Sequence, residues 1–137
     1  LYGTGWEKAH EYGWLRERLG EVTPVYGADY NRVLNGAAMA LVFLSKLNND
    51  TYTRRCFEIP AAGALMVAEY THDLADNLFV PEVEAVYFRS HDELVAQVKK
   101  YLADDTLRAR VAAAGHARLL RDGHEVTDRA REILAYV

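Results

Sequence analysis

The chain has 137 residues, of which 50% are hydrophobic, 26% charged and 11% aromatic, and its 16 Lys and Arg against 20 Asp and Glu give a net charge of -4. This composition is typical of one globular domain and excludes a disordered chain, which would combine low hydrophobicity with high net charge. The acidic balance also argues against a nucleic-acid-binding protein, which would hold phosphates on a basic face.

Three features bear on where the chain acts. The longest uncharged apolar stretch, Ile59 to Ala68, is too short to span a bilayer. No basic segment followed by an apolar run opens the chain, as a signal peptide would. The single cysteine, Cys56, excludes an internal disulfide and a cysteine-based zinc site, and it fits a reducing compartment. We therefore expect a cytoplasmic protein without a transmembrane segment.

The first residues predict that the chain is a piece of a longer protein. It begins with Leu rather than Met, and Leu1-Tyr2-Gly3-Thr4-Gly5 is typical of the end of a strand followed by a glycine turn. A trimmed tag or a disordered N-terminus is the alternative explanation.

Short apolar runs alternate with segments of helical periodicity along the chain. The runs are bounded by Gly, Pro, Asn or charged residues, and they are apolar on both faces, as strands of a buried parallel sheet are. The predicted strands are Val22–Tyr26, Ala40–Leu44, Leu65–Ala68 and Ala85–Phe88. Strands that alternate with helices predict an α/β fold, here a Rossmann-like parallel sheet with flanking helices.

The helices that we predict follow or separate these strands. Thr71 is a candidate cap for a short helix that carries Leu74 and Leu78, and Ser90 with Glu93 forms the S-x-x-E pattern of a capping box. The longer helices are expected from about Thr51 to Gly63 and over Asp92–Leu102, Asp105–Arg121 and Glu125–Tyr136, the last with an apolar face of Val126, Ala130, Ile133 and Leu134.

The most informative stretch for function follows the strand Ala40–Leu44 and opens the next helix. Ligands of open α/β sheets bind beyond the carboxyl ends of the strands. Asp50 or Thr51 is expected to cap that helix, and Arg54 and Arg55 lie in its first turn, where cations oppose the helix dipole. A bound anion, held by free amides and a guanidinium, would explain these arginines. The alternative is that they are solvated or paired with nearby carboxylates.

Glu58 lies eight positions after Asp50 and, in a helix that starts near Thr51, two turns into it. A carboxylate among small apolar residues requires a polar partner. It is predicted either to accept hydrogen bonds from ligand hydroxyls or to form an ion pair with Arg54 or Arg55. Pro60 is expected to kink the helix or end its regular part.

The segment Asp50 to Ala68 resembles the donor-binding segment of GT-B glycosyltransferases. The family pattern is E-G-F-G-x-x-x-x-E-A-M-A-C-G-x-P-V-I-A, and this chain has D-T-Y-T-R-R-C-F-E-I-P-A-A-G-A-L-M-V-A without a gap. The variant T-x-R-x-F-E-I-P-A-x-G is similar to the group-1-like subfamily that includes spore-maturation (CgeB-like) proteins. Weaker likeness extends to Leu1–Trp6, to Tyr26–Ala38 and to the segment around Phe88–Leu94.

This resemblance implies that the chain is the C-terminal domain, residues 1–137, of a hexosyltransferase-like enzyme, and that it binds a nucleotide-diphospho-sugar donor. The first strand of that domain and the N-terminal domain that holds the acceptor would lie outside this chain, so the chain alone would be inactive. No metal or other cofactor is implied. The acceptor and the catalytic residues stay unassigned.

By match to the motif, Glu58 would hold the ribose hydroxyls and Asp50 the hydroxyls of the transferred sugar. The amides of Thr51, Tyr52 and Thr53 would hold the diphosphate, and Arg54 or Arg55 would add positive charge against it. This charge would stabilise the departing diphosphate, which is the electrostatic part of glycosyl transfer.

The sequence departs from the family pattern in the donor loop. Asp50 is shorter than the usual Glu, and the two loop glycines are Thr51 and Thr53. These departures motivate the alternative of a catalytically degenerate, glycosyltransferase-like binding module. A receiver-like signalling domain is a third possibility, but the apolar runs end in Ser45, Tyr70 and Ser90 rather than in an acidic cluster.

Other candidates for chemistry are weaker. Gly3-Thr4-Gly5 lacks the third glycine of a dinucleotide fingerprint. The five histidines, His10, His72, His91, His116 and His124, show no spacing of metal ligands and are expected at the surface or in caps. Tyr26 and Tyr30 are candidates for a nucleobase pocket but more simply packing residues, and Cys56 is expected to be a small core residue.

Overall fold

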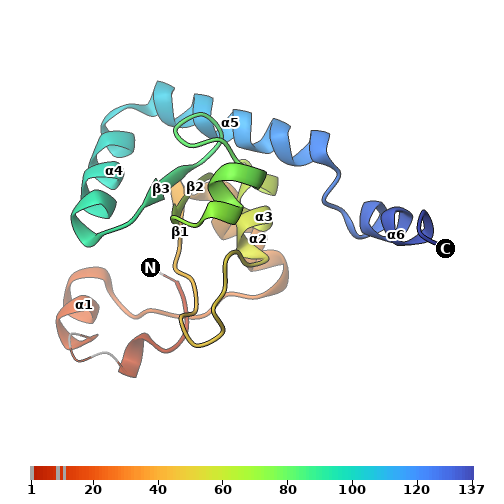
Figure 1. Ribbon diagram of the computed structural model, residues 1–137. Coiled ribbons are helices and arrows are strands. Elements are labelled where there is room, and N and C mark those ends of the chain that lie inside the picture. Colours follow the sequence, from red (N-terminus) through yellow and green to blue (C-terminus); the bar gives the residue numbers. More distant parts are fainter. Residues whose placement is uncertain (1, 9, 11) are drawn as a thin grey trace. The chain divides into compact units, whose positions relative to one another are not determined.

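The computed structural model describes residues 2–8, 10 and 12–137 (Figure 1). The chain forms two compact units, Leu1–Val33 and Leu34–Val137, and each is described by itself. Leu1, with which the likeness to a family strand begins, lies outside the described residues.

The first unit contains a 3-10 helix, η1 (Trp6–Lys8), helix α1 (Tyr12–Leu19) and most of α2 (Gly27–Gly36). The predicted strand Val22–Tyr26 is wrong. Only Thr23 forms a parallel bridge, to Tyr2, and the Gly3 amide donates to the Thr23 carbonyl at 3.1 Å. Pro24 has no N–H to donate, so the ladder does not continue past Thr23.

The second unit is built on a three-stranded sheet of β1 (Met39–Val42), β2 (Leu65–Glu69) and β3 (Val86–Phe88), in the order β1-β2-β3. Both pairings are parallel. The other three predicted strands are thereby confirmed with small shifts of their ends. A parallel open sheet with flanking helices is an α/β, Rossmann-like half fold, as the alternating pattern predicts.

Five helices follow in the second unit: α3 (Arg55–Ala61), the π-helix η2 (Asp73–Leu78), α4 (His91–Ala103), α5 (Asp105–Asp122) and α6 (Val126–Leu134). The expected caps are partly confirmed. Ser90 Oγ accepts from the Glu93 amide at 3.2 Å, but the Glu93 carboxylate accepts from the Arg89 amide, one residue before the cap. Thr71 Oγ1 accepts from the Leu74 amide at 3.1 Å and so caps η2.

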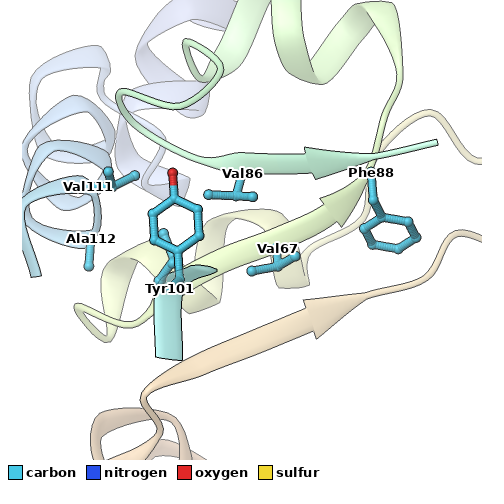
Figure 2. Close-up of a cluster of buried hydrophobic side chains, with 7 residues drawn as sticks. Val67, Val86, Phe88, Tyr101, Val111 and Ala112 are labelled. Carbon is cyan, nitrogen blue, oxygen red and sulfur yellow. The ribbon is translucent and has the colours of Figure 1, made fainter. Parts of the chain in front are cut away.

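The core lies where β2 and β3 pack against α4 and α5. Tyr101 of α4 is fully buried, and Figure 2 shows its ring between the α5 side chains Val111 and Ala112 and the strand residues Val67 and Val86. Residues 65–68 of β2 are all buried, which requires cover on both faces of the sheet because successive side chains alternate.

Helix α6 is confirmed at the predicted place, but its apolar face is not packed. Val126, Ile133 and Leu134 are 86%, 66% and 71% exposed. None of the helices among the described residues is long and apolar enough to cross a membrane.

Candidate functional site

The segment between β1 and α3 carries most of the predicted site residues, and it differs from the prediction at the start of the helix. Helix α3 begins at Arg55, with Arg54 at the N-cap position and no side-chain cap. Asp50 and Thr51 therefore do not cap it, and Glu58 lies in its first turn rather than two turns in. Pro60 lies near its end, and Gly63, at φ +72°, closes it.

The helix starts late because backbone hydrogen bonds hold the preceding residues in another conformation. The Asp50 amide donates to the Ser45 carbonyl at 3.1 Å, which closes a turn that contains Asn49 at φ +52°. The Thr51 carbonyl accepts from the Thr71 hydroxyl at 2.6 Å. The first hydrogen bond of helical type beyond Thr51 runs from the Cys56 amide to the Thr53 carbonyl, two residues later.

The amides of Thr51, Tyr52 and Thr53 are the candidate anion donors of this loop. Within residues 2–8, 10 and 12–137, none of these three amides donates a hydrogen bond. Tyr52 is 48% exposed, and its ring meets the ring of Phe57 edge to face at 5.8 Å. Three consecutive free donors can bind an anion.

Two of the charged residues of the site, Arg54 and Glu58, form an ion pair, and Arg55 is separate from it. Arg54 Nε lies 2.8 Å from Glu58 Oε1, the ion pair that was one of the two predictions for Glu58. The Glu58 side chain is 31% exposed, so a ligand can still reach it. Arg55 is exposed and forms no ion pair with any residue that the structure describes. Its charge is thus available to an anion.

Glu58 also lines a pocket of about 600 Å³ between α3, the end of α5 and the start of α6. The rings of Phe57 and His124 both line it, with centroids 4.9 Å apart and planes tilted by 48°. Arg129 Nη2 lies 2.7 Å from His124 Nδ1, which must accept because a guanidinium only donates. Burial and the positive charge of Arg129 lower the pKa of His124, which keeps the ring neutral.

The carboxyl ends of β2 and β3 add residues that the sequence did not predict. Glu69 ends β2, and its carboxylate accepts from the Leu44 amide and from Lys46 Nζ. The Arg89 guanidinium lies over the Tyr70 ring, 3.6 Å from the centroid. These side chains come from separate strands, so only the parallel order of the sheet could have indicated their proximity.

Several of the weaker candidates have structural roles or are exposed. Cys56 is fully buried, as expected, and burial raises its pKa. His116 Nδ1 donates to the Pro60 carbonyl at 2.9 Å, which joins α5 to α3. Tyr26 is 73% exposed. Across the part of the chain that the structure describes, no group of three or more His, Cys, Asp or Glu residues could hold a metal ion.

One of three comparisons with known proteins found a match, to a glycosyltransferase-like family. A search of curated proteins and a search of solved structures found no match. The family model described as glycosyl transferase-like matches residues 1–135. Because this match covers nearly the whole chain, including both units and the loop between β1 and α3, the chain belongs to the glycosyl transferase-like family.

Proposed function

We propose that this chain is the nucleotide-sugar-binding, C-terminal domain of a GT-B glycosyltransferase, similar to the spore-maturation group, that moves a sugar from a nucleotide-diphospho-sugar to an acceptor. A facing N-terminal domain would hold the acceptor. The family match supports glycosyl transfer in general, and the geometry of the loop between β1 and α3 supports the donor site.

The observation that carries the proposal is the run of free amides in this loop. The amides of Thr51, Tyr52 and Thr53 have no acceptor among the described residues. They lie beyond the carboxyl end of a parallel strand, where α/β folds bind their ligands. A diphosphate would supply acceptors for these donors, and Arg55 would oppose its charge.

Glu58 would bind the ribose of the same ligand. Its carboxylate lies one turn into α3, and Arg54 holds one oxygen. An ionised carboxylate accepts hydrogen bonds from two neighbouring hydroxyls, which is the chemistry that a ribose presents. Asp50, at the start of the loop, would bind the hydroxyls of the transferred sugar.

Calorimetric titration of the chain with UDP and with GDP tests this proposal. We expect one nucleotide to bind. Replacement Glu58→Gln removes charge-assisted hydrogen bonds worth roughly 1.5–3 kcal/mol, so the affinity should fall about 10- to 100-fold.

Glu132→Gln is the matched control, because Glu132, like Glu58, is paired with an arginine that precedes it by less than five residues, here Arg129 of α6. This variant should bind as the unmodified chain does. If a folded chain binds neither nucleotide, or if Glu58→Gln binds as tightly as the unmodified chain, the proposed donor site is wrong. If the chain binds nucleotide but the longer enzyme transfers no sugar, the degenerate binding module is the better description.

A further inference from the structure

Two side chains at the carboxyl end of β2 hold the loop that carries the proposed donor site. Glu69 is the last residue of β2. Its Oε2 accepts from the Leu44 amide at 2.6 Å, and its Oε1 accepts from Lys46 Nζ at 3.0 Å. Both partners lie where the chain leaves β1. Glu69 therefore fixes the point at which the loop begins.

Burial alone would raise the pKa of the Glu69 carboxyl. The hydrogen bond from the Leu44 amide and the contact with Lys46 outweigh this effect and lower the pKa below its ordinary value. The carboxylate is therefore ionised at neutral pH, and the bond to the Leu44 amide is a charge-assisted one.

Thr71 holds the other end of the loop, two residues beyond Glu69. Its hydroxyl donates to the Thr51 carbonyl at 2.6 Å and accepts from the Leu74 amide at 3.1 Å. A threonine hydroxyl has one proton to give and lone pairs to receive, so both bonds form together. Leu74 is fully buried. Thr71 thus joins the exposed loop to the interior.

The other hydrogen bonds near this part of the loop are local. The amides of Asn48, Asn49 and Asp50 donate to acceptors on Ser45 and Lys46. Such bonds shape a turn but do not fix it relative to the sheet. The bonds to Glu69 and Thr71 are the ones that tie it to the strand beside it.

We propose that Glu69 and Thr71 are positioning residues of the donor site, which hold the backbone of residues 51–53 so that its three amides face one diphosphate. The identity of the ligand in this inference rests on the proposed function. The ordering of the loop does not. Neither side chain would touch the reacting atoms.

The test compares four variants of the chain, three at threonine positions and Glu69→Gln. Thr71→Val keeps the branched shape and removes both hydrogen bonds, Thr71→Ser keeps the hydroxyl, and Thr106→Val makes the same change at an exposed position of α5. Two properties are measured by NMR and calorimetry: hydrogen exchange of the Asp50 amide, with the Val67 amide of the buried strand as internal reference, and the affinity for UDP and GDP.

Of the two bonds that Thr71→Val removes, the one to the Thr51 carbonyl holds the loop, and loss of one hydrogen bond typically changes an equilibrium about fivefold. In Thr71→Val we expect the Asp50 amide to exchange about fivefold faster relative to Val67 and the nucleotide to bind about fivefold more weakly. Thr71→Ser should restore both values to within about twofold, and Thr106→Val should leave both unchanged. Glu69→Gln should change the same two properties in the same direction.

Equal acceleration at Asp50 and Val67 in Thr71→Val would mean a general loss of stability and would overturn the positioning role. Unchanged exchange at Asp50, or unchanged affinity for a nucleotide that the unmodified chain binds, would also overturn it. If the unmodified chain binds neither UDP nor GDP, the proposed function fails, and the exchange comparison alone still decides whether Thr71 orders the loop.

Discussion

Gly115 of α5 is predicted to be the glycine whose replacement damages the second unit most. An added Cβ would lie 2.3 Å from the backbone oxygen of Glu84, about 1 Å closer than ordinary van der Waals contact. That oxygen is part of the main chain and cannot rotate away. Overpacking of this kind costs roughly 1–3 kcal/mol of stability. The higher helix propensity of Ala offsets about 1 kcal/mol of that cost. The balance is a net cost, and we expect Gly115→Ala to lower the free energy of unfolding by about 1 kcal/mol.

The same substitution at Gly13 should have the opposite sign. Gly13 lies inside α1, and a Cβ there would meet no atom within 4 Å, so Gly13→Ala should stabilise its helix by about 1 kcal/mol. Urea unfolding followed by circular dichroism gives the free energies, and hydrogen exchange reports on each unit separately. A Gly115→Ala variant as stable as the unmodified chain would refute the close contact between α5 and Glu84.

Two further predictions concern side chains around the site. Tyr87 Oη is buried and lies 3.1 Å from the Leu74 carbonyl and 2.9 Å from the Phe79 carbonyl, so Tyr87→Phe should cost about 1 kcal/mol of unfolding free energy; unchanged stability would contradict these bonds. The pKa of His124 is lowered in the folded chain. As the pH falls through the ordinary value of 6.5, the unfolded chain therefore binds more protons at this residue than the folded chain does. The free energy of unfolding should decline in that pH range. His124→Asn should flatten this decline, and an NMR titration that places the pKa of His124 at or above 6.5 would contradict the partly buried ring beside Arg129.

The sequence predicted those parts of the fold that depend on local pattern. Leu65–Ala68 is apolar at every position because β2 is buried on both faces. Ser90 marks the start of α4 because a short polar side chain satisfies a free amide one turn on. Apolar residues recur at helical spacing over several turns of α4 and α5, so both helices can be predicted without knowledge of the fold.

The parts that were missed depend on contacts between distant residues. Asp50 and Thr51 are good helix caps, but a hydrogen bond from Thr71, twenty residues away, holds the Thr51 carbonyl outside the helix. The bond between Glu69 and the Leu44 amide likewise joins adjacent strands. At Val22–Tyr26 the apolar run indicated a strand, but Pro24 has no amide to donate. Local propensity does not contain this information.

The most direct test of the account is a titration of the isotopically labelled chain with UDP and then with GDP, followed by amide NMR. We expect one nucleotide to shift the amide resonances of Thr51, Tyr52, Thr53 and Glu58, while the resonances of Ile133 and Leu134 at the far end of α6 stay unchanged. Shifts that cluster elsewhere, or no shifts from a folded sample at saturating nucleotide, would contradict the assignment of this loop as the donor site.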